Sequence, residues 1–281
     1  MAHKRRGCQS LCRRPIRKGF LAGWGISGVI STRLTILHME GNVMPPLGII
    51  SGPMLLKSHV LGRLKPRALE TPFGPATILL SDEVAFLPRH GLEGEPYILP
   101  HRINHPANLT ALRDLGVRQV VSANSTGSLK TAFPPGTLVV PDDYIMLAAS
   151  PTVFHDQPVH ITPALSEELR QEWLSAAADC RLAIVNGGVY WHTVGPRFET
   201  RAEVRMASAF ADIVGMTLGG EASVAKELGL DYASLCSVDN FAHGIGGKPL
   251  TMKEIVRCSR ENAGAIVRIV KQLLEKRRGN G

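Results

Sequence analysis

Short apolar runs alternate with amphipathic segments along the chain from Leu47 onward. Runs rich in Val, Ile and Leu that end at glycine, proline or a polar turn residue predict buried strands, and apolar residues spaced three and four apart predict helices. The predicted strands are Leu47–Ile50, Ala76–Leu80, Val84–Leu87, Gln119–Ala123, Leu138–Val140, Ala183–Val185, Gly188–Trp191, Ile213–Met216 and Tyr232–Val238. The predicted helices are Ala107–Leu115, Leu165–Ala178, Arg201–Ala209, Glu221–Leu228 and Met252–Lys276.

The order of these elements indicates the fold class. Strands that alternate with helices are typical of an α/β protein in which helices flank a central sheet. The two strands on either side of Ser81-Asp82-Glu83 are interpreted as an antiparallel hairpin, so we expect a mixed β-sheet rather than a purely parallel one. Residues 44–281 contain no internal repeat and no interdomain linker, which predicts a single domain.

The formal net charge of +8 is concentrated at the N-terminus. Residues 1–43 hold eight of the 32 Lys and Arg residues but only one of the 24 acidic residues. The rest of the chain is nearly neutral and has no basic stripe with interleaved aromatic residues, so only the leader favours a nucleic-acid-binding module. We interpret residues 1–43 as a disordered extension, or as upstream sequence before a natural start at Met44.

Cysteine usage and hydropathy indicate the compartment. The five cysteines are odd in number and scattered, which predicts free thiols in the reducing cytoplasm. No apolar run approaches the ~18 residues that span a bilayer, so no membrane partner is expected. The ten histidines lack zinc-site spacing, and neither Ser51 nor Ser125 lies in a G-x-S-x-G motif. We therefore expect neither a metal centre nor a serine hydrolase.

Polar loops follow several of the predicted strands. In open α/β sheets ligands bind beyond the carboxyl ends of the strands, and backbone N–H groups, hydroxyls and arginine are typical of anion sites. The Arg-His pair directly after a strand could hold a phosphate, although a solvated loop is the alternative. The loops are Ser51-Gly52, Arg89-His90-Gly91, Asn124–Gly127, Met216-Thr217 and Asp239-Asn240.

Between Met44 and the final helix the chain has a series of short motifs, including Gly48-Ile-Ile-Ser-Gly52, Thr71-Pro-Phe-Gly74, Pro88-Arg-His-Gly91, Pro100-His-Arg-Ile-Asn104, Ser122–Leu129, Gly195-Pro-Arg-Phe-Glu-Thr-Arg-Ala-Glu203, Gly215-Met-Thr217 and Val238-Asp-Asn240. In these motifs and their order the chain resembles the methylthioadenosine phosphorylase and purine nucleoside phosphorylase family. The resemblance implies one domain around a central mixed sheet, assembled as a homotrimer or a dimer of trimers with active sites near the subunit interfaces.

The resemblance also implies residue roles. Phosphate would be surrounded by Arg89, His90, Asn124 and Thr217. The family's first loop usually reads Gly-Gly-Thr-Gly with a phosphate-binding threonine; here Pro53 stands in its place, and Ser51 would supply the hydroxyl. The nucleoside would be contacted by Ser125 and Met216 at the sugar, by Phe198, Glu199 and Asn240 at the base, and by Met252, Ile255 and a neighbouring subunit's His101 near the 5′ end.

These roles imply phosphorolysis. Inorganic phosphate, the co-substrate, would attack the anomeric carbon and give a free purine and (5-methylthio)ribose 1-phosphate in purine salvage, without a cofactor. Glu199 and Asn240 match the N1–H donor and the O6 and N7 acceptors of a 6-oxopurine, so methylthioinosine, inosine or guanosine is the expected substrate. Two alternatives remain: a methylthioadenosine phosphorylase, and a nucleosidase that uses water and recruits Asp239.

Overall fold

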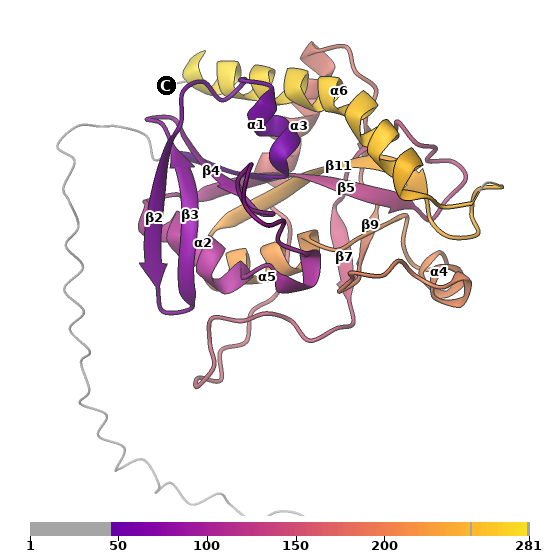
Figure 1. Cartoon of the computed structure of the whole chain (residues 1–281), viewed down its shortest axis with the longest axis horizontal. Coiled ribbons are helices and arrows are strands. Elements are labelled where there is room, and N and C mark those ends of the chain that lie inside the picture. Colours follow the sequence, from indigo (N-terminus) through magenta and orange to yellow (C-terminus); the bar gives the residue numbers. More distant parts are fainter. Residues whose placement is uncertain (1–45, 248, 280–281) are drawn as a thin grey trace, which may run out of the picture. The chain divides into compact units, whose positions relative to one another are not determined.

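The computed structural model describes residues 46–247 and 249–279, so the extension expected at residues 1–43 lies outside the described residues. Within the described residues, eleven strands form one sheet (Figure 1). The strands are β1 Leu47–Ser51, β2 Lys65–Thr71, β3 Gly74–Leu80, β4 Val84–Pro88, β5 Gln119–Ser128, β6 Leu138–Val140, β7 Asp143–Met146, β8 Val185–Asn186, β9 Val189–His192, β10 Ile213–Gly215 and β11 Asp231–Phe241.

The sheet is mixed, as the sequence predicts. Its main path runs β2-β3-β4-β1-β5-β10-β9-β7, while β11 pairs with both β5 and β6. Strand β1 is parallel to β4 and β5, and β5 is parallel to β11. The hairpin expected around Ser81-Asp82-Glu83 is present, with β3 and β4 antiparallel. The parallel strands share their carboxyl ends, which brings Ser51, Pro88 and the end of β5 to one edge.

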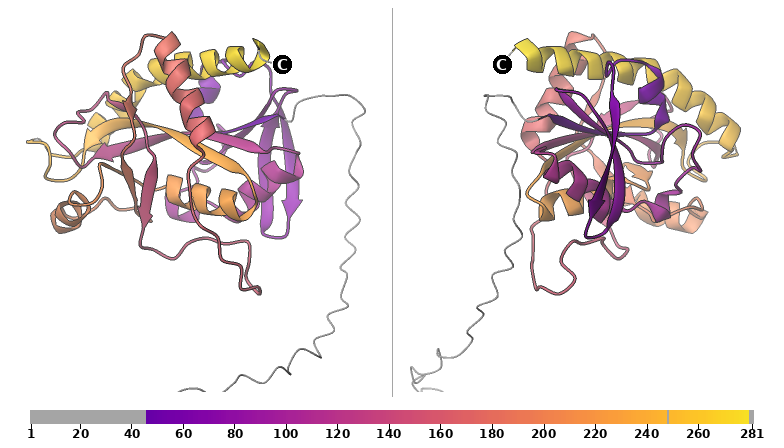
Figure 2. Two further views of the ribbon diagram at one scale, coloured as in Figure 1. Left: turned by 180° about the vertical axis from the view of Figure 1, so that it is seen from behind. Right: turned by 60° about the vertical axis from the view of Figure 1, so that its left-hand side comes forward.

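Helices cover both faces of the sheet (Figures 1 and 2). The helices are α1 Pro53–Lys57, the 3-10 turn η1 Pro100–Arg102, α2 His105–Asp114, α3 Glu167–Asp179, α4 Arg201–Ala207, α5 Leu218–Glu227 and α6 Met252–Gly279. One core lies against α3 and α6 and the other against α2 and α5. Ile49 belongs to the first core and Ile50 to the second, because successive residues of a strand point to opposite faces. Burial on both faces explains why β1 is an unbroken apolar run.

Several element predictions were wrong in extent. The sequence analysis missed α1, β2 and β7; β2 is a largely exposed strand with three charged residues, so it lacks the apolar run that indicates a buried strand. The residues expected as loops at Asn124–Gly127 and Asp239-Asn240 continue β5 and β11. They remain in the strands because β5 and β11 pair along almost their whole length, and this pairing compensates for the small and polar side chains.

The structure also bears on the expected free thiols and on membrane-spanning helices. Cys180, Cys236 and Cys258 are free thiols, and Cys8 and Cys12 lie outside the described residues. Between residues 46 and 279, leaving out residue 248, no helix is long and apolar enough to cross a membrane.

Candidate active site

Arg89 lies at the centre of a polar cluster at the carboxyl edge of the sheet. It follows β4 directly, and its N–H donates to the carbonyl of Ser51 at the end of β1 (3.2 Å). The side chain is only 3% exposed and donates to the carbonyls of Ile50 (3.1 Å) and Ala123 (3.1 Å). Its Nη2 also donates to Asn124 Oδ1 (2.8 Å). The backbones of two strands, β1 and β5, therefore hold the guanidinium in place.

Glu221, from the first turn of α5, balances the charge of Arg89. Its Oε1 lies 2.8 Å from Arg89 Nε without the alignment of a hydrogen bond, and its Oε2 accepts from Arg89 Nη2 (3.2 Å) and from the Tyr232 hydroxyl (2.7 Å). Burial raises the pKa of the Glu221 carboxyl, while Arg89 and the Tyr232 hydroxyl oppose that rise. The sequence analysis gave Glu221 no functional role; the only signal was an acidic residue in an otherwise small and apolar helix turn.

Asn124 and Thr217 complete this cluster. Asn124 Nδ2 donates to Thr217 Oγ1 (3.1 Å), and Arg89 Nη1 donates to the same oxygen (3.4 Å). Thr217 is the N-cap of α5 but makes no side-chain capping bond, and its backbone N–H donates to the Tyr190 hydroxyl (3.2 Å). The structure thus brings together four of the five residues expected around phosphate, namely Ser51, Arg89, Asn124 and Thr217.

His90, the fifth of these residues, lies half-buried next to Arg89. Its Nδ1 is 2.8 Å from the carbonyl oxygen of Ile98, and its ring stacks on Tyr97 with centroids 4.6 Å apart. Burial lowers the pKa of His90 to about 4; the nearby Arg89 charge lowers it further, and the bond to Ile98 opposes both effects. The imidazole is therefore neutral at pH 7.

Two more neutral histidines, which the sequence analysis missed, pack against the start of α5. A Cβ on Gly219 would lie 2.8 Å from the His192 ring, and one on Gly220 would lie 2.7 Å from the His105 ring. Burial lowers the pKa of His192 to about 4 and, together with His192, Arg89 and His90, lowers that of His105 to about 3. Only glycine at both positions allows the rings to approach the helix so closely.

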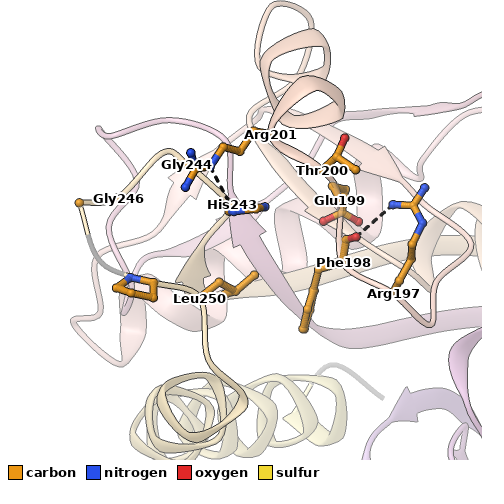
Figure 3. Close-up of a pocket in the computed structure, with 11 residues that line it drawn as sticks. Arg197, Phe198, Glu199, Thr200, Arg201, His243, Gly244, Gly246 and Leu250 are labelled. Carbon is orange, nitrogen blue, oxygen red and sulfur yellow. Dashed lines mark hydrogen bonds between the residues drawn. The ribbon is translucent and has the colours of Figure 1, made fainter.

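A cavity of about 610 Å³ lies beside α4 (Figure 3). Its lining residues come from the segment at the start of α4 and from the loop between β11 and α6: Arg197, Phe198, Glu199, Thr200, Arg201, His243, Gly244, Gly246, Gly247, Pro249 and Leu250. Phe198 is 40% exposed, whereas Glu199 is buried and its Oε1 accepts from the Thr193 hydroxyl (2.8 Å). A flat aromatic ring and a carboxylate at one cavity suit a planar ligand with N–H groups.

Thr193 links this cavity to the Arg89 cluster. Its hydroxyl reaches Glu199, and its N–H donates to the carbonyl of Gly215 (2.9 Å), two residues before Thr217. Met216, which stands between Gly215 and Thr217 in the chain, packs against Gly195: a Cβ on Gly195 would lie 2.5 Å from the Met216 sulfur. A short chain of hydrogen bonds therefore connects the Arg89 cluster with the cavity.

Strand β11 has a bulge at Asp239, the residue before Asn240. The register of β11 against β5 shifts between Val238 and Asn240, and bulges of this kind redirect side chains near active sites. Asn240 Nδ2 donates to the carbonyl of Phe241 (2.9 Å), and a Cβ on Gly127 would lie 2.9 Å from that nitrogen. Asn240 is thus held against β5.

Asp239 is fully buried behind the exposed Ser125. Its carboxylate accepts from Ser125 Oγ, from Ser237 Oγ (2.9 Å) and from Asn262 Nδ2 of α6 (2.7 Å). Burial raises the pKa of Asp239, and these donors oppose the rise. The residue is occupied by structural hydrogen bonds.

The residues expected near the 5′ end lie apart from this cluster. His101 is exposed in η1, Met252 is 59% exposed, and Ile255 is half-buried in the first turn of α6. From this part of the chain the cavity takes Pro249 and Leu250 rather than Met252 or Ile255. Because Met252 is exposed, it is not a core residue of this chain.

The chain matches the family described as the phosphorylase superfamily over residues 50–275. It therefore belongs to that superfamily, which confirms the resemblance seen in the sequence. A relative named "Probable 6-oxopurine nucleoside phosphorylase" from Archaeoglobus fulgidus is 40% identical over 235 residues, covering 82% of this chain and 96% of the relative. A "Probable S-methyl-5′-thioinosine phosphorylase" from Methanothermobacter thermautotrophicus is 38% identical over 80% of this chain and 81% of its own length.

Solved structures share the fold. Methylthioadenosine phosphorylase from Schistosoma mansoni in complex with adenine superposes with a TM-score of 0.74 at 26% identity, covering 84% of this chain and 93% of that one. A methylthioadenosine phosphorylase from an antarctic soil metagenomic library gives a TM-score of 0.73 at 30% identity, with 83% and 86% covered. The predicted mixed α/β fold is confirmed.

Proposed function

We propose that the protein catalyses phosphorolysis of a 6-oxopurine nucleoside, with methylthioinosine, inosine or guanosine as the preferred substrates. The products are the free purine and ribose 1-phosphate or its 5-methylthio derivative. The observation that carries the proposal is the Arg89–Asn124–Thr217 cluster, joined through Thr193 to a cavity with Phe198 and Glu199. The names of the relatives at 38% and 40% identity support the same activity.

Phosphate binds at the anion cluster in this proposal. Arg89 acts chiefly through its neighbours, because its donors already meet Ile50, Ala123, Asn124, Thr217 and Glu221. It fixes the Asn124 amide and the Thr217 hydroxyl for the anion, and Ser51 and His90 border the same space. Phosphate then bonds to C1′ as the C1′–N9 bond breaks, and its negative charge stabilises the oxocarbenium-like sugar.

The base is read by Glu199 and Asn240. Glu199 uses Oε1 for Thr193, which leaves Oε2 to accept the N1–H of a 6-oxopurine. Asn240 uses one amide proton for Phe241, so the other can donate to N7, where negative charge develops as the purine leaves. Phe198 stacks on the purine, and Met216 and Ser125 contact the sugar.

The remaining parts of the proposal concern the 5′ end, the assembly and the cell. At the start of α6 Met252 is exposed and Ile255 is half-buried, and His101 is exposed in η1, which suits contacts formed with a second subunit. We therefore propose that the protein assembles as a homotrimer, or as a dimer of trimers, in which these residues complete the pocket for the sugar 5′ end. The enzyme acts in cytoplasmic purine salvage and uses no cofactor besides phosphate.

The decisive experiment is cleavage of inosine and methylthioinosine with and without phosphate. We expect purine release to require phosphate and to yield a sugar 1-phosphate. Equal rates in phosphate-free buffer, with free sugar as the product, would replace the proposal with a nucleosidase. The bonds of Asp239 to Ser125, Ser237 and Asn262 favour phosphorolysis, because they occupy the carboxylate that would have to activate water.

A further inference from the structure

The hydrogen-bond polarity of the anion site can be read from its protein contacts. His90 Nδ1 lies 2.8 Å from the carbonyl oxygen of Ile98. A carbonyl oxygen only accepts, so Nδ1 carries the ring proton and Nε2 of the neutral ring has a lone pair. The Cδ2 edge of the ring, which adjoins Nε2, faces Gly52, since a Cβ there would lie 4.0 Å from Cδ2. His90 therefore presents an acceptor beside the first loop.

Thr217 has the opposite polarity. Its Oγ1 receives hydrogen bonds from Arg89 Nη1 (3.4 Å) and Asn124 Nδ2 (3.1 Å). These two bonds occupy both lone pairs of a hydroxyl, so the hydroxyl proton of Thr217 is directed elsewhere. The orientation of the amide is set at its other end, because Asn124 Oδ1 accepts from Arg89 Nη2 (2.8 Å). Thr217 therefore offers a proton to the ligand.

We propose that the site selects a tetrahedral oxyanion that carries a proton, with His90 Nε2 accepting from the P–OH group of hydrogen phosphate and Thr217 donating to an unprotonated oxygen. The inference rests on the phosphate site of the proposed function and names its selectivity. Hydrogen phosphate and hydrogen arsenate offer one O–H group and three accepting oxygens. Sulfate has the same shape and charge but no proton, so its oxygen would face the lone pair of His90.

Stacking and burial hold this polarity. The His90 ring lies parallel to that of Tyr97, at an interplanar angle of 12°, which restricts rotation of the ring away from Ile98. The positive charge of Arg89, the preceding residue, disfavours a second proton on the imidazole. An unmatched acceptor in such a site weakens binding by about tenfold or more, that is by about 1.4 kcal/mol for each factor of ten.

The test is calorimetric titration of the full-length protein at neutral pH, without nucleoside, with phosphate, arsenate, sulfate and fluorophosphate. Fluorophosphate is a dianion in which fluorine replaces the hydroxyl, so it separates the effect of the proton from that of phosphorus. We expect phosphate and arsenate to bind at least tenfold more tightly than sulfate and fluorophosphate. Sulfate or fluorophosphate binding as tightly as phosphate would overturn the inference without any variant.

A variant supplies the second arm. In His90→Gln the amide can turn an N–H toward the anion, so we expect the preference for phosphate over sulfate to fall below about threefold. His160→Gln, at an exposed histidine, is the matched control and should keep the wild-type ratio. An unchanged ratio in a folded His90→Gln protein would overturn the assignment to His90. Binding does not depend on turnover, so phosphate-independent cleavage alongside selective phosphate binding would sink the proposed function alone.

Discussion

The Arg89 guanidinium and the Glu221 carboxylate form a buried ion pair across 132 positions of sequence. Arg89 Nε lies 2.8 Å from Glu221 Oε1, and the two side chains are 3% and 1% exposed. The pair joins the end of β4 to the first turn of α5. The ion pair keeps Arg89 ionised within the protein, and the remaining guanidinium donors reach Asn124 and Thr217, so Arg89 orients these two side chains.

Removing the charge of Glu221 tests the ion pair. We expect Glu221→Gln to lower the free energy of unfolding by about 3–5 kcal/mol, because the Arg89 charge remains buried without its partner. Urea denaturation measures the change. Glu275→Gln breaks an exposed pair with Lys271 and should cost less than about 1 kcal/mol. A Glu221→Gln loss no larger than that of the control would contradict the structural role of the pair.

Shortening or replacing Arg89 tests its role at phosphate. We expect Arg89→Ala, and also Arg89→Lys, to raise the phosphate KM by about tenfold or more, because Asn124 and Thr217 lose their orienting partner. The nucleoside KM should change much less. Steady-state kinetics with each substrate varied in turn gives both values, and circular dichroism checks that the variants are folded. An unchanged phosphate KM would mean that the anion binds elsewhere.

The base preference depends on Asn240 and Glu199. Adenine presents a lone pair at N1 and an amino group at C6, so with Glu199 and the Asn240 amide it leaves groups unpaired, at roughly 1–3 kcal/mol each. We therefore expect wild-type protein to cleave methylthioinosine, inosine or guanosine about tenfold to hundredfold better than methylthioadenosine. Asn240→Asp should shift kcat/KM toward the 6-amino substrate. Wild-type turnover of methylthioadenosine at least as fast as of both methylthioinosine and inosine would refute these roles.

The buried histidines make stability depend on pH. The pKa of His105 is lowered to about 3 in the fold, against an ordinary value of about 6.5 that applies to the unfolded chain. Between these values the unfolded chain binds more protons, so the contribution of His105 is complete above about pH 6.5 and is lost as the pH falls. We expect the decrease in unfolding free energy from pH 7 to pH 5 to be roughly 1–2 kcal/mol smaller in His105→Gln.

Urea unfolding of wild type, His105→Gln and His160→Gln at both pH values makes this comparison. His160 is exposed, so its variant should show the wild-type dependence on pH. If His105→Gln lost as much stability as the wild type between the two pH values, His105 would not be held neutral in the fold. The absolute stability of each variant does not affect the comparison, because only the difference between pH values is used.

Sequence patterns located most elements that have a strong local signal. The apolar runs of β1, β4 and β6 and the amphipathic repeat of α6 appear where they were predicted. The Arg89-His90 pair after β4 was found because an arginine and a histidine beside a strand end are unusual chemistry for a plain turn. Strand β2 was missed because its stability comes from pairing with β3 and not from its own side chains.

By itself, the sequence determined the alternation of strands and helices, the mixed sheet, the family and the residue types available for chemistry, because these depend on local pattern and on motifs. Only the tertiary structure decided which partners those residues have. Glu221, Tyr232, His105 and His192 reach the site through long-range packing, and no spacing in the chain reveals it. The tautomer of His90 and the proton of Thr217 follow from Ile98, Arg89 and Asn124, since hydrogen-bond polarity is set by the neighbours that folding supplies.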